Sequence, residues 1–222
     1  MRSRYIAAVQ DKPWWLAGGI PASACVAAYQ PKGASSYEAS KVNLANPGVY
    51  NAVDGAAYPT WNVSTGWTGN GVDQYLLTVK PSTYWSMIIR TNRTSGKVGF
   101  LGYVRQETPL IHYGYYYGNV PNVDGYTGHH YTHYVRIKGL GASFANHIFA
   151  IARNKVYLNG VYVNQTAATN NVQALYDVAL FARNYQGTID SFTAATIPAV
   201  AFYNTELTNY QVAALTAAMN AL

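Results

Sequence analysis

The chain has 222 residues, of which 11% are charged and 14% are aromatic, with 21 tyrosines and a formal net charge of +6. Its lysines and arginines are scattered singly, so the charge alone does not indicate nucleic-acid binding. A single cysteine, Cys25, excludes an intrachain disulfide and a cysteine-based zinc site, and no run of about 18 apolar residues predicts a membrane-spanning helix.

The first part of the chain, residues 1–20, is expected to be an arm that precedes one domain at residues 21–222, because all-β domains reach this length with a single core. Trp14 and Trp15 stand in this arm without a strand pattern around them. Two adjacent tryptophans must cover an apolar surface, either the flank of their own domain or a neighbouring subunit. We expect the neighbouring subunit, which makes this an assembly arm.

After the arm, turn-forming residues interrupt the sequence every 8 to 12 residues, and short β-rich runs lie between them. Such spacing is typical of a sandwich or barrel. The expected strands cover residues 24–29, 74–79, 84–90, 97–104, 111–117, 130–138, 145–153, 155–163, 178–183, 187–195 and 197–203.

One β-hairpin is indicated especially well. Asn159-Gly160 separates the runs KVYL and VYVN, and Asn-Gly supplies the two positive φ values of a type I′ turn. Alternation along the first run puts Val156 and Leu158 on one face and Tyr157 on the other.

The end of the chain predicts a buried strand followed by a helix. Residues 197–203 are apolar at both odd and even positions, as in a strand covered on both faces. Thr208 and Gln211 have the spacing of a capping box, and Val212, Leu215, Met219 and Leu222 then form one apolar stripe.

Several stretches together resemble the laminin-G-like, concanavalin A-like lectin and glucanase superfamily. They are YLNG at 157–160, the ending FYNTELTNYQVAAL, and the stretch AAYQPKGASSYEASKVNLANPGVYNA with PTWNVSTGW and GNGVDQYLLT after it. The resemblance covers residues 24–222, and these stretches look like the versions of the domain that are found in bacteriophage structural proteins. It implies an all-β jelly roll of two antiparallel sheets, closed by the last strand and a short helix.

Members of this superfamily include sugar-binding modules, adhesion modules and glycoside hydrolases. Its glucanases carry Glu-x-Asp-x-x-Glu on one strand, and none of the three glutamates of this chain (Glu38, Glu107 and Glu206) stands in that pattern. We therefore expect no enzyme. A different carboxylate pair, Asp73 with Asp190, keeps a divergent glycoside hydrolase as a third hypothesis.

An aromatic hairpin is the main candidate for binding. Its runs are IHYGYYYGNV and HHYTHYVRIK, and alternation predicts that each run has one row of such side chains on one of its faces. If the two faces coincide, the rows form one strip. Flat rings with polar tips suit sugar stacking, a subunit interface, or an ordinary half-buried sheet face. The two rows comprise Tyr113, Tyr115, Tyr117, His129, Tyr131 and His133.

Metal binding has weak support in the sequence. His129 and His133 are expected on one face with His130 on the other, which leaves zinc without a third ligand. Asn119, Asn122 and Asp124 offer oxygen ligands for calcium, although residues of these types beside Gly125 equally form turns. No cofactor is expected, and calcium stays open.

The residues together favour a non-enzymatic bacteriophage virion protein, a decoration protein with a lectin-like fold that presents a glycan-adhesion surface. Its expected partners are further copies of itself, other virion proteins and a cell-surface glycan, with neither nucleic acid nor membrane. The alternative is a free carbohydrate-binding lectin, located outside the cell rather than in a virion.

Overall fold

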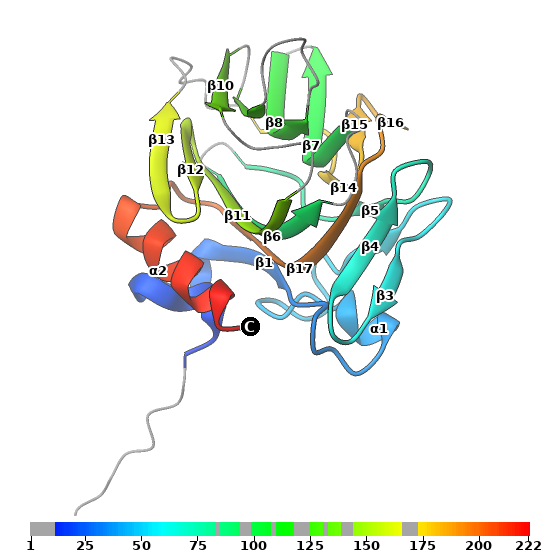
Figure 1. Ribbon diagram of the computed structural model, residues 1–222, viewed down its shortest axis with the longest axis horizontal. Helices are drawn as coiled ribbons and strands as arrows, with labels where there is room; N and C mark the ends of the chain where they lie inside the picture. Colours follow the sequence, from blue (N-terminus) through cyan, green and yellow to red (C-terminus); the bar gives the residue numbers. More distant parts are fainter. Residues whose placement is uncertain are drawn as a thin grey trace, which may run out of the picture.

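Two β-sheets packed face to face form the body of the molecule (Figure 1). The computed structural model describes residues 12–82, 85–93, 99–107, 110–117, 125–130, 133–138, 144–165 and 173–222. The expected all-β sandwich with a short C-terminal helix is confirmed.

Sheet A contains eight strands among the described residues, and all of its pairs are antiparallel. Seven follow one another in the order β13-β12-β11-β6-β17-β4-β3, and β1 also pairs with β17. Their bounds are Cys25–Tyr29 (β1), Thr60–Asn62 (β3), Gly66–Asn70 (β4), Ser86–Arg93 (β6), Phe144–Ala152 (β11), Lys155–Leu158 (β12), Val161–Gln165 (β13) and Ala194–Tyr203 (β17).

Sheet B contains nine strands among the described residues, in the order β10-β9-β8-β7-β14-β5-β2, while β15 pairs with β7 and β16 pairs with β15. Only the β15–β7 pair is parallel among these described strands. Their bounds are Val53–Asp54 (β2), Leu76–Leu77 (β5), Gly99–Glu107 (β7), Leu110–Tyr117 (β8), Gly125–His130 (β9), His133–Lys138 (β10), Ala179–Leu180 (β14), Arg183–Tyr185 (β15) and Thr188–Asp190 (β16).

Short helices complete the described part. Two 3-10 helices, η1 (Trp14–Gly19) and η2 (Ala22–Ala24), precede β1, and one turn of helix, α1 (Tyr37–Ser40), follows it. The C-terminal helix α2 (Asn209–Asn220) begins at the predicted capping box, in which the side chains of Thr208 and Gln211 bond each other's backbone N–H groups. None of the described helices is long and apolar enough to cross a membrane.

The main core lies between the two sheets. Its largest side chains are Trp67, Trp85, Tyr29, Phe149, Phe181 and Phe202. Trp67 is fully buried and donates from Nε1 to Ser40 Oγ at 2.7 Å, while Trp61 is partly buried against the same core.

A second apolar cluster covers the opposite face of sheet A. There α2 and η1 pack against β1, β6, β11 and β17, so this sheet has apolar contacts on both sides (Figure 1). Val200 and Phe202 belong to the main core, whereas Ala201 and Tyr203 belong to the second cluster. This explains why β17 is apolar at both odd and even positions, as the sequence predicted.

Pro198 lies inside β17, where a proline removes one ladder hydrogen bond. The strand tolerates it because β17 changes neighbour at this point: Ala194 to Ile197 pair with β4, and Val200 to Tyr203 pair with β1. The register with β6 is also irregular between Thr196 and Ala199. The proline therefore occupies the junction between two partners.

The predicted Asn-Gly hairpin joins β12 to β13. Asn159 and Gly160 have φ values of 49° and 80°, as the type I′ turn requires. Val156 and Leu158 contact the main core, whereas Tyr157 contacts the second cluster. The predicted alternation of these faces is confirmed.

Candidate functional site

The aromatic hairpin differs from its prediction. The run expected as one strand at residues 130–138 is divided between β9 and β10, so alternation cannot be counted through it. Backbone pairing sets Tyr113 opposite His130, Tyr115 opposite Gly128 and Tyr117 opposite Tyr126. His129 is opposite Gly114 instead, and His133 is paired with His130.

The faces of the two rows therefore do not coincide at His129. The expected separation of His130 from His133 fails for the same reason, because these two residues are directly paired. Tyr131 lies outside the described residues. Binding of sugar or of another subunit by this hairpin stays a prediction.

The weak calcium candidate, Asn119, Asn122 and Asp124, also lies outside the described residues. Within the part of the chain that the structure describes, no group of three or more His, Cys, Asp or Glu side chains could hold a metal ion. Calcium binding at 119–124 stays a prediction.

Trp14 corrects the expectation for the arm. Its side chain is only 8% exposed and lies in the second apolar cluster, where η1 packs against α2. Trp15 is partly buried in the same cluster, its ring perpendicular to that of Trp14 at 5.8 Å between centroids. The apolar surface that these tryptophans cover is the flank of their own domain, because α2 supplies it.

A pocket opens where β1, the start of β6 and the end of β17 meet, and we call it the end pocket. Its volume is about 190 Å³. Seven aromatic or aliphatic residues line it together with four polar residues, three of which are exposed. The lining residues are Val26, Tyr50, Val79, Lys80, Pro81, Ser82, Trp85, Gln173, Phe202, Tyr203 and Asn204.

The buried side chains of the end pocket are held rigidly. The rings of Trp85 and Phe202 are stacked, with centroids 6.2 Å apart and planes 9° apart. Tyr203 donates its hydroxyl to the Trp15 carbonyl oxygen at 3.0 Å, and burial raises the pKa of this phenol well above its ordinary value. The pocket thus combines apolar rings with the polar groups of Lys80 and Gln173, as small-molecule sites commonly do.

Tyr50 is the aromatic side chain of this pocket that solvent reaches. It is 44% exposed and its φ is 55°, in the left-handed region that bulky residues rarely adopt. Phe181 is the other described aromatic residue with a positive φ, and it is fully buried, so core packing offsets its strain. Tyr50 has no such burial, and backbone strain on an exposed ring is a sign of function.

The backbone that precedes Tyr50 is held by Asn43, a fully buried side chain. Asn43 Nδ2 donates to the carbonyl oxygens of Val26 and Val49 at 2.9 and 2.8 Å. Its Oδ1 accepts from the N–H of Ala28 at 3.0 Å and from the N–H groups of the two residues at 45 and 46.

Two further bonds complete this support. The Tyr29 hydroxyl donates to the carbonyl oxygen of Tyr50 itself. Asn51 Oδ1 accepts from Asn43 N–H at 3.0 Å and from Gly48 N–H at 3.2 Å. The segment 43–51 therefore covers the free edge of β1 and presents the Tyr50 ring at the pocket.

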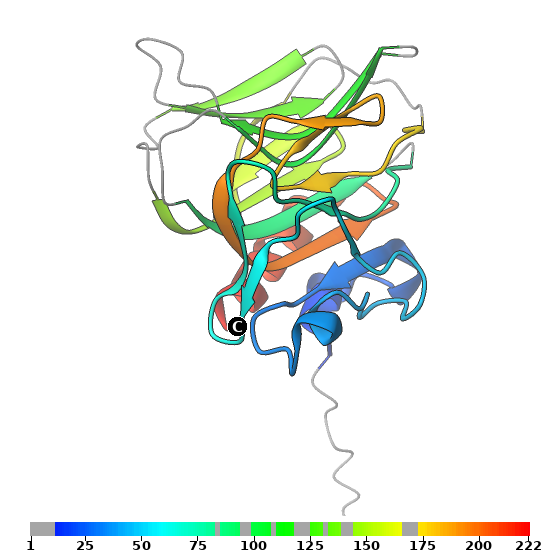
Figure 2. The ribbon, with the colours of Figure 1, turned by 90° about the vertical axis from the view of Figure 1, so that its right-hand side faces the viewer.

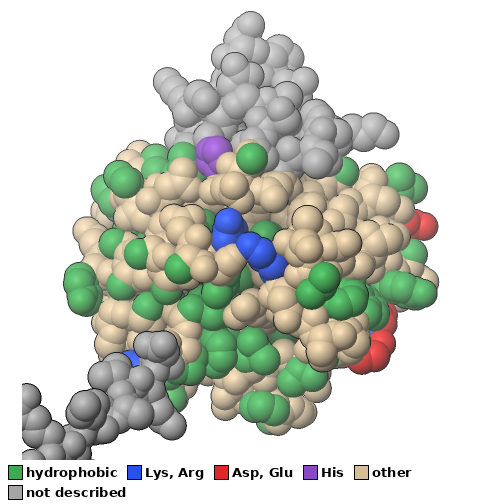
Figure 3. Space-filling view, turned by 60° about the horizontal axis from the view of Figure 1, so that its bottom comes forward, with side chains coloured by type: hydrophobic (Ala, Val, Ile, Leu, Met, Phe, Trp, Pro, Cys, Tyr) green, Lys and Arg blue, Asp and Glu red, His purple; other side chains and the backbone are tan. Residues whose placement is uncertain are grey.

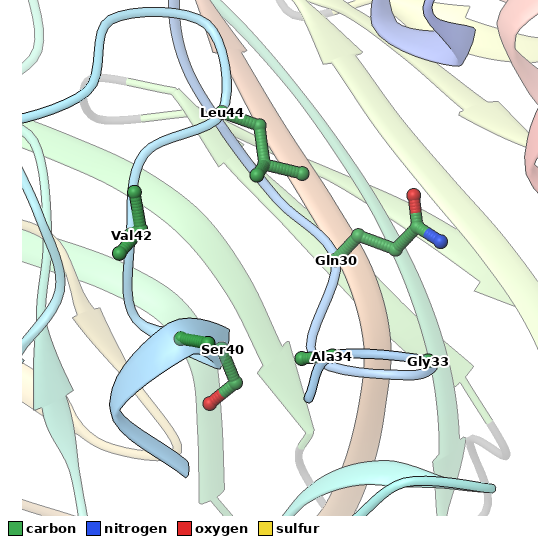
Figure 4. A pocket seen from close by; sticks show the side chains of 7 residues that line it. Gln30, Gly33, Ala34, Ser40, Val42 and Leu44 are labelled. Carbon is green, nitrogen blue, oxygen red and sulfur yellow. The ribbon is translucent and has the colours of Figure 1, made fainter. Parts of the chain in front are cut away.

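A larger cleft of about 270 Å³ lies nearby, between the segment after β1 and the segment around α1 (Figure 4). It is lined by Gln30, Gly33, Ala34, Ala39, Ser40, Val42 and Leu44. No aromatic residue is among these seven, and Ser40 already bonds Trp67 and the Tyr37 carbonyl oxygen. The end pocket has the richer chemistry although it is smaller.

Another polar cluster joins α1 to β2. The Tyr37 hydroxyl donates to Asp54 Oδ1, and Lys41 Nζ lies 2.7 Å from Asp54 Oδ2 and 3.0 Å from Glu38 Oε2. Burial, followed by the hydrogen bond to Asp54, raises the pKa of Tyr37. These groups satisfy one another, so the cluster is a structural connection.

The carboxylates of the hydrolase hypothesis have structural partners. Asp190 accepts two hydrogen bonds from the Arg183 guanidinium, at 2.6 Å each. Asp73 accepts from Asn70 Nδ2 at 2.8 Å within an exposed turn.

The sequence interpretation missed the end pocket, although the stretch NLANPGVYN was among those quoted for the resemblance. Three asparagines around Pro47-Gly48 could have indicated an ordered loop, since Asn side chains bond backbone groups in turns. Nothing local shows that Tyr50 has a positive φ or that residues 80, 173 and 204 meet it.

No family model and no curated protein matches this chain. Solved structures do. Trypanosoma rangeli sialidase in complex with 2,3-difluorosialic acid superimposes with a TM-score of 0.64 at 14% identity, covering 90% of this chain and 33% of the sialidase. The chain thus spans about a third of the sialidase length.

A second match spans both partners. Domain 4 of AbnA, an extracellular GH43 arabinanase from Geobacillus stearothermophilus, solved in complex with arabinotriose, gives a TM-score of 0.55 at 14% identity and covers 87% of this chain and 98% of that domain. The HCR/D W1238A mutant gives 0.58 at 11% identity, covering 88% of this chain and 52% of its own. At these identities the likeness establishes the fold alone, which is a β-sandwich.

Proposed function

We propose that this domain binds carbohydrate without cleaving it, and that the end pocket is its binding site. The observation that carries the proposal is Tyr50, an exposed ring on a strained backbone at the opening of an aromatic pocket. A sugar ring offers C–H groups to an aromatic face and hydroxyls to polar side chains. The pocket supplies both, with Tyr50 beside the amides of Gln173 and Asn204.

Two further facts support the proposal. A domain of similar length and fold was solved with arabinotriose bound, so this architecture accommodates an oligosaccharide in that protein. The absence of catalysis is supported by the missing glucanase pattern and by the bidentate bond that occupies Asp190.

The test is a glycan array followed by titration calorimetry on the best neutral and acidic glycans, with three variants. Tyr50→Gly removes the ring and suits a positive φ, so it should lower affinity about tenfold while the fold is kept. Tyr50→Phe should retain binding. Tyr58→Ala, which removes a 59% exposed tyrosine outside the pocket, is the matched control. Equal binding by Tyr50→Gly, or no bound glycan, would contradict the proposal.

A virion role is the finer part of the proposal. It is supported by the resemblance of residues 24–222 to bacteriophage structural proteins and by the low content of charged residues. Figure 3 shows one face on which hydrophobic and uncharged polar groups far exceed charged ones, as in a surface that meets other proteins or sugars. Several copies on a particle would then add weak glycan contacts into strong adhesion.

The virion role has its own measurement. Antibodies against this protein should label purified particles, and the protein should sediment with them. A protein found only free in the medium would favour the alternative, a secreted lectin, and would leave the sugar-binding site unaffected.

A further inference from the structure

We infer that the end pocket selects sugars that carry an anionic group, and that Lys80 is the residue responsible. The inference rests on the proposed carbohydrate binding. It starts from the charges of the pocket, because Lys80 is the one charged side chain among its eleven described lining residues.

Lys80 is exposed, and none of the ion pairs found among the described residues involves it. Its ammonium group is therefore available to a ligand, unlike that of Lys41, which two carboxylates occupy. An anionic sugar that reaches Lys80 from the pocket would gain a charge-assisted hydrogen bond.

Glu206, the carboxylate closest in sequence to a lining residue of the end pocket, does not neutralise the charge of Lys80. It follows Asn204 by two residues and is bonded to Lys155 at 2.8 Å, with Arg153 at 3.5 Å. Arg153 is also at this end of the sandwich, since its N–H donates to the Trp85 carbonyl oxygen. Two cationic side chains, Lys155 and Arg153, thus accompany the Glu206 carboxylate near the pocket, in addition to Lys80.

One other carboxylate acts nearby. Burial, followed by the charges of Cys25 and Asp177, raises the pKa of Tyr29, whose hydroxyl bonds the Tyr50 carbonyl oxygen. Asp177 does not line the pocket. A negative group bound at Lys80 consequently meets a cation in the pocket and no anion among its lining residues.

The experiment compares matched neutral and anionic sugars. The probes are lactose, sialyllactose and a sulfated lactose, titrated at low and high salt into the full chain. Both anionic sugars should bind about fivefold or more tightly than lactose at low salt, and added salt should reduce this preference. A preference for the carboxylate alone or the sulfate alone also supports the inference and identifies the group.

Variants assign the effect to one residue. Lys80→Gln should remove the preference for the anionic sugars over lactose, whereas Lys80→Arg should keep this preference. Lys12→Gln is the matched control, because Lys12 is exposed and does not line the pocket, and it changes the net charge equally.

The outcomes separate this inference from the proposed function. If lactose and its anionic forms bind equally, and Tyr50→Gly weakens all three, the inference is wrong and the sugar site stands. An anionic preference that survives Lys80→Gln also overturns it. If no sugar binds to the chain, the inference and the proposed function both fail.

Discussion

The surfaces around β1 and β17 differ in how they are stabilised and in what they leave exposed. On one side α2 and η1 cover sheet A with apolar side chains, and almost all of that surface is buried. On the other, the segment 43–51, beside β1 (Figure 2), is held by the hydrogen bonds of one buried asparagine, yet it leaves Tyr50 and Val49 exposed. A well-supported segment that leaves its outermost residues exposed can present them to a ligand. This distinguishes the candidate site from the docked helix α2.

The largest expected effect concerns the side that α2 and η1 cover, and it is alkaline unfolding. Burial raises the pKa of the Cys25 thiol to about 12 from an ordinary 9.0, and burial, with the charges of Glu206 and Tyr162, raises that of Tyr157 to about 12 from 10.0. The folded state keeps these protons while the unfolded state releases them, so stability is full below about pH 9 and falls as pH rises toward 12.

Melting temperature measured against pH should therefore decline steadily above about pH 9. Cys25→Ala should lessen the first part of this decline, because it removes the group with the lower unfolded pKa. A melting temperature that stays constant up to pH 11 would contradict the account.

The next effect breaks the apolar side. Leu215 in α2 is fully buried, and Leu215→Ala should lower the free energy of unfolding by about 2–5 kcal/mol. Tyr210→Ala, on an exposed position of the same helix, should change it by less than about 0.5 kcal/mol. Sugar affinity should be unaffected in the folded protein of both variants, as chemical denaturation and calorimetry would show.

Asn43→Ala breaks the polar side. It leaves the Ala28 N–H and the carbonyl oxygens of Val26 and Val49 without their partner, which should lower the free energy of unfolding by about 2–4 kcal/mol. In contrast to Leu215→Ala, it should also weaken sugar binding, since Tyr50 loses its support. Asn62→Ala, in an exposed turn, is the control. Normal sugar binding by folded Asn43→Ala would contradict the interpretation that Asn43 supports Tyr50 for binding.

The smallest effect concerns the start of α2. Thr208→Ala removes the bond to Gln211 N–H at 3.2 Å and should lower the free energy of unfolding by about 1 kcal/mol, whereas Thr208→Ser should keep it. Because the helix takes no part in the site, neither variant should alter binding. If Thr208→Ala changed the sugar affinity, helix α2 and the end pocket would be coupled, which would contradict their separation.

Local patterns predicted most of what depends on near neighbours. The Asn159-Gly160 turn, the capping box of Thr208 and the double burial of β17 all follow from residues a few positions apart, and each was confirmed. Counting alternation through residues 130–138 failed, because two strands divide that run.

The arm and the candidate site show where local reasoning ends. Nothing near Trp14 in the sequence reveals that α2, about 200 residues later, covers it. The residues of the end pocket likewise come from positions 26, 50, 79–85, 173 and 202–204, which only the pairing of β1 and β6 with β17 brings together.

The sequence by itself determined the class of fold, the places of the main turns and the docked C-terminal helix, because those depend on periodicity and on short-range hydrogen bonds. Only the tertiary structure decided which surface the tryptophans cover and which aromatic ring is left exposed. The physical reason is that burial and backbone strain depend on partners far away in the chain. Tyr50 looks like any of the 21 tyrosines until Asn43 and Tyr29 are seen to hold it in place.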